Sequence, residues 1–273
     1  MEDAMGDRMK MYEGMESSRR LLPLIPVVAR LDGRAFHTFC KGLERPFDKR
    51  FHDLMVDTTR ALVDETAAKI GYTQSDEISL VWHVEDPKGE NYFGGRVQKM
   101  ASVLAASATA FFNRQLPSRI PEKAAYLPMF DARVWGVPNQ EEAANALLWR
   151  ERDATRNSIL ATAQAHFSHK EMQGLNTKQL QEKLFQERGI NWGMDTPTWA
   201  KRGTWLRRAT RSTPFTAEEI ESLPPMHAAR RNPGLVITRS VLEAVDMPSF
   251  NSVINRVGVI FRGEKPFTGS DLE

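Results

Sequence analysis

Short apolar runs separated by helical stripes dominate the first half of the chain. Runs rich in branched and aromatic side chains predict strands at residues 23–32, 72–84 and 130–137. Apolar side chains at helical spacing predict amphipathic helices at residues 48–69 and 95–114, and we expect Gly71 to close the first of these. A polar turn divides the middle run, so the order is strand, helix, two strands, helix, strand. This order predicts an α+β fold with a ferredoxin-like antiparallel sheet, the arrangement found in the palm of many polymerases.

The second half is more helical and more basic. The segments expected outside the palm-like part are a short helical arm at 6–20, a long helix at 140–167, a mostly helical stretch at 169–188, a loop-rich stretch at 196–234, and late strands at 234–238 and 257–261. We therefore divide the chain into a palm-like catalytic region, 1–138, and a helical and basic region, 139–273, packed with the first as one unit.

Composition indicates an ordinary globular protein, with 41% hydrophobic and 26% charged residues and a formal charge of +2. The single cysteine, Cys40, excludes internal disulfides and a cysteine-rich zinc site, and it fits a reducing compartment. We see no signal-peptide core and no run approaching the roughly 20 apolar residues of a membrane span. These features predict a cytoplasmic protein without a membrane partner.

Two acidic groups at the ends of apolar runs are the candidate chemistry. Asp32 follows the first predicted strand, and Asp76 and Glu77 occupy the polar turn in the second. Carboxylates placed beside apolar strands favour a cation, and a pair of them can hold two divalent ions around a nucleotide triphosphate. Strand alternation sends Asp76 and Glu77 to opposite faces, so we expect Asp76 to be the ligand and Glu77 to lie behind it. Judged locally, plain turn residues would explain the same pattern.

Cations and free amides near these carboxylates could bind phosphate. The amides of residues 33–37 could form an anion-binding nest, although His37 alone indicates no general base. Arg96 and Lys99 share one helix face and could neutralise a triphosphate, unless that face is simply solvated. Between Thr196 and Ala217 the chain has no acidic residue. The aromatic rings of Trp199 and Trp205 lie within that stretch, which suits RNA, although a loop with inward-packed tryptophans is the alternative.

Taken together, these motifs resemble the tRNA-histidine guanylyltransferase family, and within it the bacterial guanylyltransferase-like branch that repairs tRNA 5′ ends. The matching segments occur in order at residues 32–37, 45–48, 74–77, 130–134, 149–157, 189–192 and 201–203, and they span roughly residues 6–205. One departure matters. Where eukaryotic members carry His-Ile-Asn-Asn, this chain has Thr155-Arg156-Asn157-Ser158. The missing histidine favours template-directed repair over untemplated guanosine addition.

The resemblance implies a role for each matching residue. Catalysis is assigned to Asp32, Asp76 and Glu77, and two Mg²⁺ ions to Asp32, the Gly33 carbonyl and Asp76. The nucleotide triphosphate, ATP or GTP, is assigned to Asp32, Gly33, Arg34, Ala35, Phe36, His37, Ser75, Asp76, Arg96 and Lys99. A second nucleotide or the tRNA 5′ end is assigned to Arg133, Arg150, Asp153 and Asn157. Binding of tRNA is assigned to Lys201, Arg202, Arg207, Arg208 and Arg211.

The expected activity is template-directed 3′-5′ nucleotidyl transfer to the 5′ end of tRNA, after activation of that end by ATP or GTP, in a homotetramer. Two alternatives stay open at this point. A palm-type nucleotide cyclase or signalling nucleotide synthase would form its product from nucleotides alone. A non-catalytic RNA-binding module would show no magnesium-dependent turnover.

Overall fold

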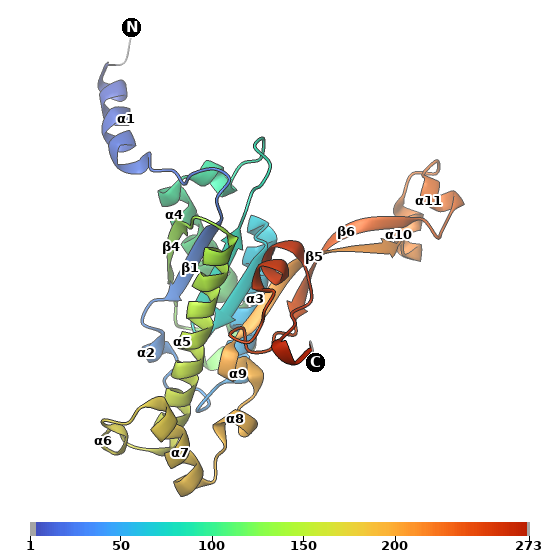
Figure 1. The fold of residues 1–273 in the computed structure, drawn as a ribbon. Coiled ribbons are helices and arrows are strands. Elements are labelled where there is room, and N and C mark those ends of the chain that lie inside the picture. The colour runs from blue at the N-terminus through green and yellow to red at the C-terminus, as the bar shows by residue number, and fades with distance from the viewer. Residues whose placement is uncertain (1–3, 272–273) are drawn as a thin grey trace.

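A six-stranded antiparallel sheet forms the centre of the computed structural model, which describes residues 4–271 (Figure 1). The strands are β1 (Val27–Gly33), β2 (Ile70–Gln74), β3 (Glu77–Trp82), β4 (Phe130–Gly136), β5 (Thr204–Pro214) and β6 (Val236–Val245). Their spatial order is β4-β1-β3-β2-β5-β6. The first four strands have the ferredoxin-like order, so the predicted α+β palm-like topology is confirmed.

The two predicted amphipathic helices cover one face of this sheet. They are α3 (Lys49–Thr66) and α4 (Val97–Arg119), and the stripe Phe51, Leu54, Met55, Thr58, Leu62 of α3 is buried as predicted. Asp48 caps α3 by accepting hydrogen bonds from the amides of Arg50 and Phe51 at 2.9 and 3.3 Å. Both helices pack on this face of the sheet, and their buried side chains form the first apolar core with residues of β1, β3 and β4.

The prediction that Gly71 closes the first helix is wrong. The helix ends at Thr66, and Ala67 turns the chain in the left-handed conformation. Gly71 lies inside β2, directly under α3, where a Cβ atom would come within 2.6 Å of the Val63 side chain. The glycine therefore serves close helix–sheet packing.

The long helix α5 (Gln140–His166) crosses the opposite face. A second core joins its first half to residues of β1, β2 and β3 and to the segment 247–260, so residues of both halves of the chain share one core. A third core forms where the end of α5 meets α7 (Thr177–Arg188) and α8 (Trp192–Asp195). The remaining short helices are α2 (Phe36–Phe39), α6 (His169–Met172), α9 (Thr198–Arg202), α10 (Ala217–Ser222), α11 (Ala228–Arg231), and the single turns η1 (Tyr92–Gly95), η2 (Pro121–Lys123) and η4 (Gly269–Asp271).

Two late predictions fail. Residues 196–234 are not mainly loop, because β5 occupies 204–214 and pairs with β2 on one side and β6 on the other. The strand expected at 257–261 is a π-helical turn, η3 (Gly258–Arg262), whose Val259 and Ile260 pack into the second core. Beyond β2, the β5–β6 ribbon leaves the body and ends in α10 and α11 (Figure 1).

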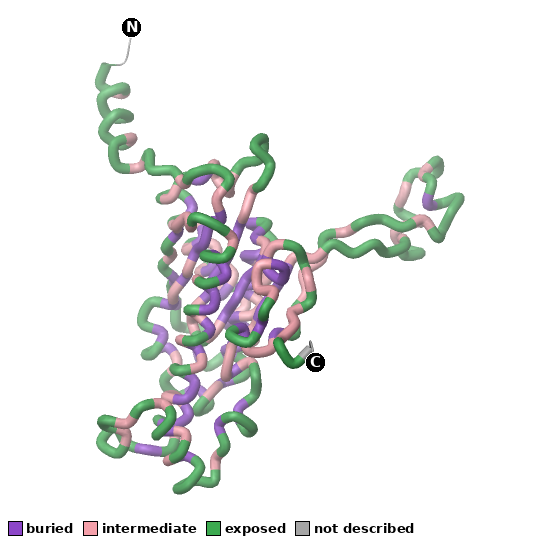
Figure 2. The backbone as a smooth tube through the Cα atoms, viewed as in Figure 1, coloured by how far each residue is buried: buried purple, intermediate pink, exposed green. Residues whose placement is uncertain are grey.

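The helix α1 (Ala4–Ser17) has no buried residue and stands away from the body (Figure 2). Among residues 4–271, no helix is long and apolar enough to cross a membrane.

Candidate active site

The candidate carboxylates lie where β1 ends and the β2–β3 turn begins. The amide of Gly33 donates to the Asp76 carbonyl at 3.1 Å, which ties the end of β1 to the turn. Ser75, at φ 51°, forms the left-handed corner of that turn. Asp76 therefore belongs to the turn rather than to the strand, and the alternation used to place it does not apply.

Three acidic residues lie side by side on neighbouring strands at this end of the sheet. Asp32 of β1 is paired directly with Glu77 of β3 on one side and with Asp131 of β4 on the other. Directly paired side chains share a face, and like charges there repel one another. Strand alternation led us to expect Asp76, rather than Glu77, on the same face of the sheet as Asp32. The pairing corrects this: Glu77 lies on the same face as Asp32.

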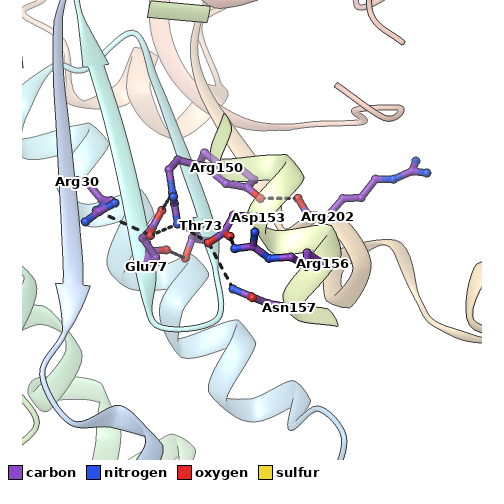
Figure 3. A network of polar contacts seen from close by, with 9 residues as sticks. Arg30, Thr73, Glu77, Arg150, Asp153, Arg156, Asn157 and Arg202 are labelled. Carbon is purple, nitrogen blue, oxygen red and sulfur yellow. Dashed lines mark hydrogen bonds and ion pairs between the residues drawn. The ribbon is translucent and has the colours of Figure 1, made fainter. Parts of the chain in front are cut away.

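Arginines neutralise the two flanking carboxylates. Arg150 of α5 donates to both carboxylate oxygens of Glu77, at 2.6 and 2.7 Å, and to Asp153 at 2.8 Å (Figure 3). Arg133 lies 3.4 Å from Asp131. Burial alone would lower the pKa of Arg150, but the bonds and charge of Glu77 outweigh it and raise that pKa. The carboxylate of Glu77 is thus bound by an arginine, and its role behind the metal ligands stays a prediction.

Asp32 and Asp76 have no such partner. Within residues 4–271, neither carboxylate forms an ion pair with a lysine, arginine or histidine. Burial raises the pKa of Asp76, and the negative charge of Asp32 raises it further, against hydrogen bonds to its own backbone and Ser75. The two carboxylates are therefore close enough to repel one another, and their charge lacks a counterion.

The loop after Asp32 differs partly from the predicted phosphate nest. The amides of Gly33 and Arg34 are used, by the carbonyls of Asp76 and Met129. Phe36 is buried among four other phenylalanine rings, and its ring would lie 2.4 Å from a Cβ atom at Gly33. Gly33 is thus required by this aromatic packing. Arg34 and His37 are exposed, and His37 lines the same cavity as Ser75.

A cavity of about 360 Å³ opens beside the turn. It lies between the loop 37–48, the start of α3, the second half of α5, and α9, and residues Gln74 and Ser75 form the wall nearest Asp76. Asn157 also lines it, whereas the stripe of α5 that contains Arg150 and Asp153 contacts the sheet.

Arg96 and Lys99 are not brought to the carboxylates. Asp32 pairs with Glu77 at one end of the sheet, and Val27 pairs with Trp82 at the other. The start of α4 lies at the second end, because η1 before it stacks on Trp82 through Tyr92 at 6.3 Å. The two ends are five residue steps apart along β1, a distance of about 17 Å. Within one chain this pair cannot reach a triphosphate held by Asp32 and Asp76.

The predicted tRNA-binding run is largely used inside the molecule. Arg207 is buried and donates to Glu243 and to the Glu264 carbonyl, each at 2.7 Å. Arg208 is bound to Ser240 and to the end of α3 at Asp64. Trp205 packs on Tyr72 and Phe250 in the second core. The expected loop is strand β5, and the burial of Arg207 argues against an RNA contact there, whereas for the half-buried Arg208 RNA contact stays a prediction.

The other cations of that run, Lys201, Arg202 and Arg211, also have partners within the chain. Lys201 donates to the Gly193 carbonyl at 2.6 Å, and Arg202 lies 3.8 Å from the buried Glu151. Arg211 shares Glu243 with Arg207 but remains exposed.

Replacing Arg207 by alanine is expected to lower the free energy of unfolding by about 3 kcal/mol, because Glu243 would lose its buried partner. On folded protein, tRNA affinity and its salt dependence should not change. Arg211→Ala is the matched control, since its exposed pair should contribute about 1 kcal/mol or less. Unchanged stability together with a weaker salt dependence would restore the original prediction.

His52 should make stability depend on pH. Burial, helped by the charge of Lys49, lowers the pKa of His52 from 6.5 to about 4. Between these two pH values the unfolded chain binds a proton that the folded chain does not, so stability falls as pH falls through this window. The full loss is about 3 kcal/mol. Denaturant unfolding of the wild type and His52→Gln from pH 7 to 4 checks this, and identical pH profiles would contradict it.

Sequence reasoning missed Arg30. It lies 3.9 Å from Glu77 (Figure 3). It is also paired directly with Arg133 across β1 and β4, and its buried Nε has no hydrogen-bond partner among the described residues. Since Arg30 precedes Asp32 by two residues in a strand, alternation alone would have placed both on one face.

Comparison with known proteins identifies the same relationship as the motifs. The family model for tRNAHis guanylyltransferase matches residues 6–138. A solved bacterial tRNA(His) guanylyltransferase-like protein in complex with ATP is 41% identical, with a TM-score of 0.71, over 75% of this chain and 88% of that one. A second, in complex with GTP, is 32% identical, with a TM-score of 0.69, over 91% and 94%.

Among curated relatives, the probable tRNA(His) guanylyltransferase of Bos taurus is 31% identical over 209 residues, which cover 70% of this chain and 67% of the relative. The family match, the shared fold and this identity agree with the order of the motifs around Asp32 and Asp76. The chain belongs to the tRNA(His) guanylyltransferase family and is a nucleotidyltransferase.

Proposed function

We propose that this chain is a template-directed 3′-5′ nucleotidyltransferase that adds nucleotides to the 5′ end of tRNA. The observation that carries the proposal is a pair of half-buried carboxylates without counterions, Asp32 and Asp76, at the end of the sheet where arginines and a cavity also lie. Phosphoryl transfer asks mainly for charge neutralisation and positioning, and these groups supply the means for both.

The donor set suits magnesium. Hard carboxylate oxygens that no cation occupies are what Mg²⁺ requires, and uncompensated negative charge favours a divalent ion. No group of three or more His, Cys, Asp or Glu side chains in the described part of the chain could hold a metal. Asp32 and Asp76, with the Gly33 carbonyl, would hold two ions together with phosphate oxygens of the substrate, because the protein supplies only a few of the ligands that Mg²⁺ requires. Magnesium there would neutralise charge developing on the phosphates.

The cavity beside Ser75 has the size for the nucleoside part of ATP or GTP. Its volume of about 360 Å³ falls within the range of small-ligand sites. A triphosphate extending from it toward Asp76 would pass the exposed Arg34 and His37 and the start of α2. The complexes of the two bacterial relatives with ATP and with GTP support such a substrate here.

Arg30 and Arg133 suit the phosphate at the tRNA 5′ end. Two guanidinium groups paired directly across neighbouring strands repel one another, and an anion between them would remove that cost. Because Arg30 precedes Asp32 by two residues on β1, an anion bound there would lie next to the nucleotide. Arg150 and Asp153 contribute indirectly, by holding Glu77 in place.

The reaction then has two in-line displacements at phosphorus. An oxygen of the tRNA 5′-monophosphate attacks the α-phosphorus of ATP, and pyrophosphate leaves. The 3′-hydroxyl of an incoming nucleotide next attacks the activated 5′-phosphate, and AMP leaves. Asp32 and Asp76 serve both steps, because in each step negative charge develops on phosphate oxygens at the same site.

Pyrophosphate release from ATP tests this function. We expect release only when a tRNA with a 5′-monophosphate is present, and none with the same tRNA carrying a 5′-hydroxyl. Release from nucleotides alone would favour a cyclase or signalling nucleotide synthase. Tight tRNA binding without any release would favour a non-catalytic RNA-binding module.

A further inference from the structure

A buried lysine lies against the segment that forms one wall of the cavity. Lys123 ends η2, is 7% exposed, and forms no ion pair with an acidic residue in 4–271. Lysines are rarely buried unless they are paired, because moving an ammonium group out of water is costly. Lys123 Nζ instead donates to the Lys41 carbonyl at 2.7 Å and lies 4.7 and 5.8 Å from the ring centres of Tyr126 and Phe39. The carbonyl and the two rings together offset the cost of burial.

The carbonyl that Lys123 binds belongs to the loop 40–48, and most residues of this loop line the cavity. The far end of the loop is fixed, because Asp48 caps α3. Near its start, Gly42 has φ 86°, and a Cβ atom there would meet nothing within 4 Å. The bond from Lys123 therefore holds the start of a loop whose next residue is not packed against the body.

The same ammonium group also contacts the helix before this loop. Phe39 is the last residue of α2, and His37 of that helix lines the cavity as well. Lys123 thus connects η2 with both parts of the chain that form this side of the cavity.

We infer that Lys123 is a positioning residue for the nucleotide, because its ammonium group holds the loop 40–48 in the conformation that binds ATP. The inference rests on the proposed function, which places the nucleoside in this cavity. Without the bond, the start of the loop would have to be ordered when the nucleotide binds. The entropy lost in ordering about one residue is enough to weaken binding about tenfold.

The variant Lys123→Met tests this inference, because methionine keeps an unbranched chain against the two rings but has no donor for the carbonyl. We expect the Kd for ATP with Mg²⁺, measured without tRNA, to rise about tenfold. The kcat of pyrophosphate release at saturating ATP should stay within about twofold, because Lys123 lies behind the loop and contacts no reacting group. Lys123→Arg keeps a charged donor and should bind ATP within about threefold of the wild type.

Stability should change little in Lys123→Met. A buried charge and its hydrogen bond are removed together, and Lys41 is exposed, so water can reach the carbonyl that is left. Denaturant unfolding of the variant and the wild type checks this.

Cys40, the single cysteine, reports the position of the loop directly. It lines the cavity next to Lys41, and its pKa is raised to about 12, first by burial and then by the charge of Asp76. The charge of Lys123 lowers that pKa, so its removal alone would slow the reaction of Cys40 with a thiol reagent. We expect Lys123→Met to react about tenfold faster instead, because the released loop opens more often.

Glu122→Gln is the matched control on the same turn. Glu122 is exposed, and its ion pair at 2.8 Å joins η2 to Arg50 of α3 rather than to the start of the loop. The Kd for ATP and the reaction rate of Cys40 should both stay within about twofold of the wild type in this variant.

An unchanged Kd for ATP or an unchanged Cys40 rate in Lys123→Met would overturn the inference. Equal effects in Glu122→Gln would assign them to η2 as a whole, and an arginine variant as weak as Lys123→Met would remove the donor as the cause, so either result would also overturn it. Failure of Lys123→Met to fold would make Lys123 a structural residue, with the same consequence. Neither measurement needs turnover, so failure of the proposed function is seen separately, as absent pyrophosphate release by the wild type.

Discussion

Replacing Asp32 or Asp76 by alanine is expected to abolish both activation and nucleotide addition. The charge stabilisation lost with one ion is worth several kcal/mol, and about 1.4 kcal/mol corresponds to a factor of ten in rate. We therefore expect a loss greater than about a hundredfold in each step for either variant. Single-turnover assays with 5′-monophosphorylated and 5′-triphosphorylated tRNA measure the two steps separately.

Stability distinguishes this loss from unfolding. Asp32 and Asp76 repel one another, so removal of either should leave the melting temperature unchanged or raised. Glu77→Ala is the control in which stability should fall, since it leaves the half-buried Arg150 without its main partner. It should cost about 3 kcal/mol of stability and reduce the rate less than Asp76→Ala. A loss below a hundredfold for Asp32→Ala or Asp76→Ala would remove the metal assignment.

Selection of the incoming nucleotide by the template base is the second large effect expected. Thr155 to Ser158 replace the histidine-containing segment that we associate with untemplated guanosine addition. Pairing with the opposite acceptor strand can then choose the nucleotide, and a wrong pair at a helix end costs a few kcal/mol. We expect discrimination of about 10- to 1000-fold in favour of the Watson–Crick partner.

The test uses four truncated tRNAs that differ only at the template base. The rate of addition of each of the four nucleotides is measured with each tRNA. Asn157→Ala serves as a control for the altered segment, because Asn157 lines the cavity and contacts Asp153. A preference for guanosine with every template would return the chain to the untemplated branch.

The palm-like sheet was predictable because its signals are local. Buried stripes on α3 and α4 and apolar runs in β1, β3 and β4 require no knowledge of tertiary contacts. Asp32 and Asp76 could be identified as candidates for the same reason, since both lie at the ends of such runs. The strand β5 was missed because arginines, threonines and a proline outnumber its apolar residues. Its pairing with β2 and β6, and the burial of Trp205 and Leu206, outweigh that composition.

The sequence predicted least well which charged side chains are exposed and which are paired within the chain. A run of arginines reads as a free surface, yet Arg207 and Arg208 find partners in Glu243 and Asp64, which are distant in sequence. Conversely, Arg20 and Arg96 are far apart in the sequence but form a direct antiparallel pair in the structure, where their like charges repel one another. Helical spacing correctly grouped Arg96 with Lys99 but gave no information about which end of the sheet they occupy.

The position of nucleotide addition tests the central claim most directly. The measurement uses a labelled tRNA that lacks its first 5′ nucleotide and carries a 5′-monophosphate, incubated with the protein, ATP, Mg²⁺ and the complementary nucleotide. The account predicts a tRNA longer by one residue at its 5′ end, formed by the wild type and not by Asp32→Ala or Asp76→Ala. A tRNA of unchanged length, or one extended at its 3′ end, would contradict it.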